Sequence, residues 1–221
     1  MAEGRLVIGT RRYSSWSMRG WLMVRMAALD VEEVVLRLAG AGAGGTPEIA
    51  AISPNALVPY LEHRGARVWE TIAIAEYCAE FHADLWPRNR TARAHARSIA
   101  AEMHAGFRAL RGAMPMNLGR TFAGLGRTPA CLADIARIEA IWAEALSAYG
   151  GPFLMGTEFS LADAMYAPVV TRFLTWQPEL SATTHGYCDA VRAHPLVDQW
   201  YRDAAAEPAE WLVPHYENPQ T

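Results

Sequence analysis

The feature that most constrains the fold is a change of pattern around Pro87. Before it, short apolar runs alternate with segments of helical spacing, whereas after it the chain lacks strand character. Pro87 suits neither a helix interior nor a strand ladder, as expected of a linker. The pattern predicts an α/β unit over residues 1–84, a linker over residues 85–90 and an all-helical bundle over residues 91–221.

The amino-terminal unit is expected to contain four strands and two main helices. Apolar or β-branched runs predict strands at Leu6–Gly9 and Val31–Leu38, and a hairpin turning at Arg64–Gly65 adds two short ones. Helical spacing is found from Met18 to Leu29 and from Thr71 to Phe81. A β-α-β unit followed by a β-β-α unit is the thioredoxin-like order. The glycine-rich stretch Ala39–Thr46 between these units is expected to be a loop.

The carboxyl-terminal unit is expected to consist of helices alone. Ala92–Ala113 is predicted to be one long helix, and Cys131–Tyr149 has a continuous apolar stripe that ends at Gly150. Ser160 begins another helix, with Asp163 in the third helical position of a capping box. Pro195 separates the last two helices.

Composition excludes several kinds of chemistry. The net charge of -3 argues against nucleic acid as the main partner, and no apolar run is long enough for a membrane span or a signal peptide. All 20 basic residues are arginine, which excludes a Schiff-base lysine and a P-loop lysine. Three distant cysteines predict neither a disulfide framework nor a metal site. We therefore expect a cytoplasmic protein without a bound metal.

Two serines precede the first helix. Ser14 and Ser15 lie where an N-cap is expected, and capping alone explains serine there. A helix start also has unpaired N–H groups and partial positive charge, so it favours an anion. A thiol held at this position ionises more readily, and a serine hydroxyl can donate a hydrogen bond to the thiolate. The turn thus predicts either a plain cap or a thiolate site.

Two further pairs could bind a peptide. A cis Val58–Pro59 bond would explain a proline that enters a strand, and it would expose the amide and carbonyl of Val58 to an extended ligand. A proline in a plain edge strand is the alternative explanation. Glu70 and Thr71 begin a helix, where they either cap it or hold the ammonium and carboxylate of an amino acid.

Together these residues resemble the soluble glutathione transferase superfamily over nearly the whole chain. Ser14–Ser15–Trp16–Ser17 resembles the Ser-Ser-Cys-Ser turn of the zeta class, and Val58–Pro59 and Glu70–Thr71 resemble its Val-Pro and Glu-Ser/Thr pairs. The resemblance implies a thioredoxin-like domain that binds glutathione, followed by a helical domain for the second substrate. It makes Ser14 or Ser15 the catalytic serine. The implied glutathione-binding residues are Trp16, Leu57, Val58, Pro59, Glu70 and Thr71.

The resemblance implies a cytoplasmic, homodimeric detoxification enzyme that uses glutathione as co-substrate to attack a small electrophile. Four departures weaken the case for maleylacetoacetate isomerisation. The zeta class has a lysine and a glutamine where this chain has Ala56 and Leu57, and it has arginines where this chain has Tyr13 and Thr175. A glutathione-dependent isomerase or dehalogenase, and a non-catalytic interaction protein of the same fold, remain alternatives.

The second substrate is expected between the first turn and the helical domain. His104, Arg108 and Arg111 fall at helical spacing, so they are expected on one face that would favour an acidic or polarised electrophile. Candidates for this site include Arg12, Tyr13, His104, Phe107, Arg108, Arg111 and Arg172.

Overall fold

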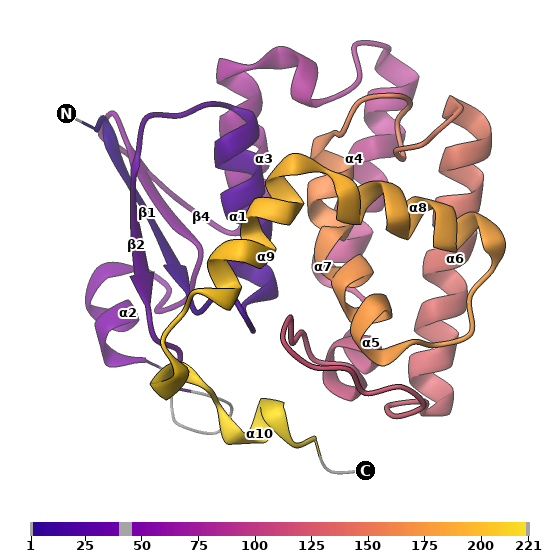
Figure 1. Ribbon diagram of the computed structural model, residues 1–221. Coiled ribbons are helices and arrows are strands. Elements are labelled where there is room, and N and C mark those ends of the chain that lie inside the picture. Colours follow the sequence, from indigo (N-terminus) through magenta and orange to yellow (C-terminus); the bar gives the residue numbers. More distant parts are fainter. Residues whose placement is uncertain (1, 40–45, 220–221) are drawn as a thin grey trace.

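The computed structural model describes residues 2–39 and 46–219. The glycine-rich segment 40–45, which the sequence predicts to be a loop, lies outside the described residues. The remainder forms a small sheet with its helices on one side of the molecule and a group of packed helices on the other (Figure 1).

The sheet has the order β2-β1-β3-β4, with β1 parallel to β2 and antiparallel to β3. Its centre is β1, where Leu6, Val7 and Ile8 are fully buried, so the apolar run predicts this strand correctly. The strands are β1 (Gly4–Gly9), β2 (Glu32–Leu36), β3 (Tyr60–His63) and β4 (Ala66–Trp69).

Helices α1 (Ser15–Met26) and α3 (Thr71–Phe81) lie between the sheet and the helical domain (Figure 1). They pack against each other, and α1 also packs against α7 (Leu161–Trp176) of the helical domain. A short helix that the sequence analysis did not predict, α2 (Pro47–Ile52), precedes β3, with Pro47 in its first turn. Because α1 contacts both domains, its amino terminus opens at their boundary.

The carboxyl-terminal domain is helical, as the sequence predicts. α7 is buried along nearly its whole length, with α4 and α8 packed against it, and α9 crosses α1 (Figure 1). Besides α7, its helices are α4 (Arg90–Ala105), α5 (Arg108–Ala113), α6 (Pro129–Tyr149), α8 (Ala182–Ala193), α9 (Pro195–Ala205) and α10 (Pro214–Glu217), and short 3-10 turns occur at Ala83–Leu85 and Ala209–Trp211.

One predicted helix is wrong. The segment 92–113 is not continuous, because α4 ends at Ala105 and α5 begins at Arg108. Phe107 between them has a left-handed backbone with φ of 59°, and its ring is buried in the core. Burial of this aromatic ring stabilises the interrupted backbone more than the alanine-rich sequence around it stabilises a continuous helix.

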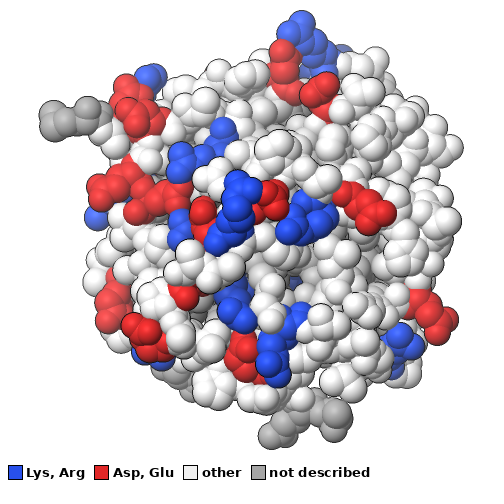
Figure 2. Space-filling model, viewed as in Figure 1, with Lys and Arg blue, Asp and Glu red and all other residues white. Residues whose placement is uncertain are grey.

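Surface charges of both signs are interspersed on the face shown in Figure 2, without one large basic or acidic patch. Over the described ranges, no helix is both long enough and apolar enough to traverse a bilayer. Within those same ranges, no cluster of three or more His, Cys, Asp or Glu side chains could hold a metal ion.

Candidate functional site

The first turn holds its two serines in different environments. Ser14 is the N-cap of α1, and its Oγ accepts a hydrogen bond from the Ser17 amide at 3.2 Å. The Ser14 hydroxyl donates to Ser17 Oγ at 2.7 Å, and Ser17 Oγ also accepts from the Gly9 amide at 2.9 Å. Ser17, which sequence reasoning missed, therefore ties the end of β1 to the start of α1. Ser14 is engaged on both sides by this capping network.

Ser15 has no such internal partner for its proton. Its Oγ accepts a hydrogen bond from Nη2 of Arg172 at 3.2 Å. Among residues 2–39 and 46–219, no protein group accepts the Ser15 hydroxyl proton. Ser14, Ser15 and Val58 line one cavity of about 340 Å³ at the domain boundary. A ligand in that cavity can accept a hydrogen bond from Ser15.

The Val58–Pro59 peptide bond is cis and lies directly beside α1. The Pro59 ring packs against Gly20, where an added Cβ would come within 2.7 Å of the ring. In the described part of the chain, the N–H and C=O groups of Val58 have no hydrogen-bond partner. They can pair with the backbone of an extended ligand. Leu57 is 60% exposed beside them.

A second cavity, of about 240 Å³, continues from the first. Glu70 and Thr71 lie at the start of α3, where Glu70 has an uncommon positive φ of 67°. Thr71 Oγ1 is 3.1 Å from Nδ1 of His104, and Nε2 of His104 is 3.6 Å from the Glu70 carboxylate. The two cavities share three lining residues, which are Trp16, Leu57 and Val58.

Three arginines surround Trp16 and Ser15. The guanidinium carbons of Arg19 and Arg111 lie 4.8 and 4.6 Å from the Trp16 ring centroid. Burial is the main cause that lowers the pKa of Arg19, Arg111 and Arg172, and it lowers the pKa of Arg172 to about 9. The charges of Arg111 and Arg172 also lower the pKa of Arg19, so the three guanidinium groups lie close enough together to concentrate positive charge at this wall.

The chain's carboxyl-terminal tail forms another wall. Tyr216 lines the first cavity and stacks on Tyr13 with ring centroids 5.2 Å apart. The Tyr13 hydroxyl donates to Glu217 at 2.6 Å and accepts from the Val213 amide at 3.2 Å. Burial raises the pKa of Tyr13 to about 12, so this phenol stays protonated.

The structure separates the predicted second-substrate residues into three groups. Tyr13, Arg111 and Arg172 line the first cavity, whereas His104 lies in the second, beside Glu70 and Thr71. The others do not line either cavity: Arg12 forms an ion pair with Glu217, Phe107 is in the core and Arg108 is exposed. The prediction that His104, Arg108 and Arg111 share one helix face is wrong, because the chain breaks at Phe107.

Sequence reasoning also missed two residues that line the first cavity and one arginine that is buried behind its wall. Arg19 follows Ser15 by one helical turn, and its position among the apolar residues of α1 was the available signal. Tyr216 and Met116 had no local signal, because distant packing alone brings them to the cavity.

Comparisons with known proteins agree with this architecture. A probable maleylacetoacetate isomerase from Caenorhabditis elegans is 27% identical over 176 residues, which cover 77% of this chain and 79% of the relative. Among solved structures, a maleylacetoacetate isomerase from Anaeromyxobacter dehalogenans 2CP-1 shares 23% identity, 96% and 97% coverage and a TM-score of 0.66. A theta class glutathione S-transferase from Xanthomonas axonopodis pv. citri, with glutathione bound, shares 20% identity, 94% and 99% coverage and a TM-score of 0.65.

Two family models match the two domains in turn. Residues 13–80 match the glutathione S-transferase N-terminal domain, and residues 92–203 match the glutathione S-transferase C-terminal domain. The chain therefore belongs to the glutathione S-transferase family.

Proposed function

We propose that this protein binds glutathione across the two joined cavities and uses its thiolate to attack a small electrophile. The observation that carries the proposal is that Val58, whose backbone amide and carbonyl have no partner among the described residues, lies between the serine turn and the Glu70–Thr71 pair. The cysteinyl backbone would pair with Val58, and the γ-glutamyl end would reach Glu70 and Thr71. Trp16, Leu57 and Pro59 would shape the wall between these ends.

Within this site, we assign the thiolate contact to Ser15 and the cap to Ser14. The Ser14 hydroxyl is engaged with Ser17, whereas Ser15 accepts from Arg172 and has no acceptor for its own proton among the described residues, which leaves that proton for a ligand. A donor on its oxygen polarises a hydroxyl and strengthens the hydrogen bond that it gives. Ser15 and Arg172 together therefore favour the ionised thiol. The new carbon–sulfur bond forms as the leaving group departs with its electron pair.

Alanine variants of the two serines test the assignment. A hydrogen bond to a charged group contributes about 1.5–3 kcal/mol, so Ser15→Ala is expected to lower kcat about 10- to 100-fold while the glutathione Kd changes little. Ser14→Ala removes an N-cap, so it is expected to cost about 1 kcal/mol of unfolding free energy. A large loss of kcat in Ser14→Ala with little change in Ser15→Ala would assign the thiolate contact to Ser14. An unchanged kcat in both variants would refute a catalytic serine.

A second candidate is glutathione-dependent isomerisation. The isomerase relatives favour it, although Tyr13 and Thr175 stand where the zeta class has arginine. Isomerisation regenerates glutathione and conjugation consumes it. Free thiol measured during turnover of a substrate panel therefore separates the two reactions, and unchanged thiol would favour isomerisation.

The setting of the reaction also belongs to the proposal. We infer a role in detoxification in the cytoplasm and a homodimer in solution, from the family to which the chain belongs. Sedimentation equilibrium of the purified protein tests the homodimer, and a single species at the monomer mass would contradict it.

A further inference from the structure

Arginines from three separate helices of the fold converge beside Ser15. Arg19 comes from α1, Arg111 from α5 and Arg172 from α7. Arg19 is fully buried and Arg172 is 4% exposed, and both Arg111 and Arg172 line the first cavity. Cations this deeply buried need compensation by an anion or by several acceptors.

In the described structure these cations donate hydrogen bonds only to neutral acceptors, and the charge of the Asp134 carboxylate offsets in part the lowered pKa of Arg111. Arg19 donates to the carbonyls of Met165 and Ser15, and Arg172 donates to the Pro168 carbonyl and to Ser15 Oγ. Arg111 likewise donates to two carbonyls, those of Met103 and Gly106. Across residues 2–39 and 46–219, none of the three forms an ion pair with Asp or Glu.

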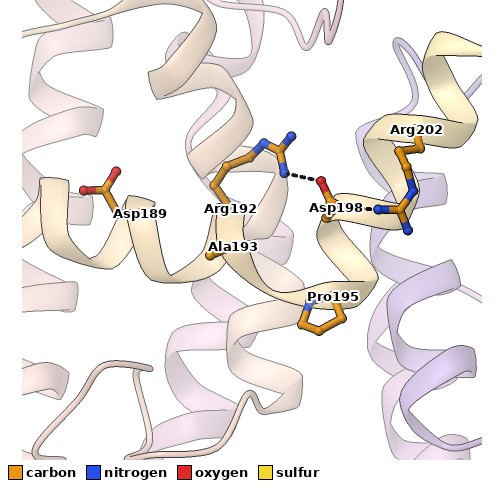
Figure 3. A pocket seen from close by; sticks show the side chains of 6 residues that line it. All are labelled: Asp189, Arg192, Ala193, Pro195, Asp198 and Arg202. Atoms are coloured by element: carbon orange, nitrogen blue, oxygen red, sulfur yellow. Dashed lines mark hydrogen bonds and ion pairs between the residues drawn. The ribbon is translucent and has the colours of Figure 1, made fainter.

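Each of the three also keeps a buried nitrogen without a hydrogen-bond partner in the described structure. These atoms are Nη2 of Arg19, Nη1 of Arg111 and Nε of Arg172. The arrangement differs from the groove between α8 and α9, where Arg192 and Arg202 share the carboxylate of Asp198 (Figure 3). Within the described residues, the groove arginines are paired with a carboxylate, whereas the three arginines near Ser15 are not.

We propose that Arg111 and Arg172, with the charge of Arg19 behind Trp16, bind a carboxylate on the second substrate. This proposal rests on the proposed function and adds the chemical class of the electrophile, which is a carboxylate. One glutathione thiolate beside Ser15 compensates one of the three charges and Asp134 offsets part of another, so positive charge remains for a further anion. Nε and Nη2 of Arg111 are engaged with carbonyls, so Nη1 is its donor left for a carboxylate, and Arg111 lines the cavity on the side of Trp16.

Two electrophiles of equal size test this preference. The probes are 4-chloro-3-nitrobenzoate and 4-chloro-3-nitrobenzamide, which differ in charge at one substituent. In each reaction the glutathione thiolate forms a carbon–sulfur bond at the chlorinated carbon, and chloride leaves with the electron pair of the broken bond. Each kcat/KM is divided by the rate constant of the same reaction without enzyme, which removes the difference in intrinsic reactivity.

Arg111→Met is the informative variant, and Arg108→Met is its matched control on the same helix. Arg108 is exposed and lines neither cavity. We expect Arg111→Met to lower the normalised kcat/KM for the benzoate about 10- to 100-fold, because it removes a charge-assisted hydrogen bond. The benzamide value is expected to change less than about threefold, and Arg108→Met is expected to leave both values unchanged.

Three results would overturn the carboxylate site. The first is an equal loss for benzoate and benzamide, and the second is no loss for either. The third is an equal weakening of the glutathione Kd, which would assign Arg111 to glutathione itself. Absence of both glutathione binding and turnover in the unmodified protein would instead refute the proposed function. Should Arg111→Met not fold, inhibition of the unmodified enzyme decides: 4-nitrobenzoate must inhibit more strongly than 4-nitrobenzamide, and equal inhibition would refute the site.

Discussion

Removal of the buried carboxylate of Asp163 is expected to be among the most damaging single substitutions in the helical domain. Asp163 is fully buried in the first turn of α7. One carboxylate oxygen accepts from the Leu154 amide at 2.9 Å and the Tyr187 hydroxyl at 3.0 Å. The other accepts from the amide and hydroxyl of Ser160 at 2.8 and 2.7 Å. Asp163→Ala leaves all four donors without this acceptor.

The expected loss of unfolding free energy depends on which of the four donors can find another acceptor. The two backbone amides cannot turn away, and each buried donor left unpaired costs about 1–3 kcal/mol. The two hydroxyls can rotate toward other acceptors. Burial raises the pKa of Asp163 and so opposes its charge, which makes the net effect smaller than the sum of four hydrogen bonds. We therefore expect a loss of about 3–5 kcal/mol, the usual cost of breaking a buried charged network.

Urea and thermal unfolding, followed by circular dichroism at fixed protein concentration, measure this loss. For a chain of this size, each kcal/mol lowers Tm by about 2–4 °C, so the expected decrease is about 6–20 °C. Asp189→Ala is the matched control, because Asp189 is an exposed aspartate of the same domain and should change stability by less than about 0.5 kcal/mol. A loss below about 1 kcal/mol for Asp163→Ala would refute the reasoning that unsatisfied donors dominate.

Two further predictions concern the cavity walls. Burial is the main cause that lowers the pKa of His104 below its ordinary value of 6.5, so the folded chain favours the neutral ring. The contribution of the neutral ring to stability is therefore complete above pH 6.5 and is lost as the pH falls below 6.5. The decrease in Tm between pH 7.5 and pH 5.5 is therefore expected to be smaller in His104→Gln, and an equal decrease would contradict this sign. Tyr216→Ala removes the ring stacked on Tyr13, so KM for the electrophile is expected to rise about 2- to 10-fold, as measured by steady-state kinetics, while the glutathione Kd is unchanged. An unchanged KM would show that the tail does not shape the site.

Local patterns were enough to predict most of the fold. The run at Leu6–Gly9 and the helical spacing at Thr71–Phe81 correspond to β1 and α3, because burial and capping act within a few residues there. The strand-free remainder likewise predicted the helical domain. Phe107 shows where such reasoning fails, since a ring buried by distant packing interrupts a segment that favours a helix locally.

The candidate site was predictable only where neighbours in sequence make it. The serine turn and the Glu70–Thr71 pair are local, and the sequence placed them at helix starts, where the structure also has them. The choice between Ser14 and Ser15 depends on Arg172, which is 157 residues from Ser15 along the chain. Tyr216 reaches the cavity from still farther, so no spacing rule could reveal it.

The same long-range contacts make the serine turn a product of both domains. Arg19 links α1 to the Met165 carbonyl of α7 at 2.7 Å, and Arg172 reaches back from α7 to Ser15. Two cations at the domain boundary therefore contact the start of α1, and neither forms an ion pair within the described residues. A bound anion would strengthen the electrostatic support of this boundary, because it offsets the charge that burial penalises. We therefore expect an anion bound beside Arg172 in the cavity to stabilise the domain boundary as well.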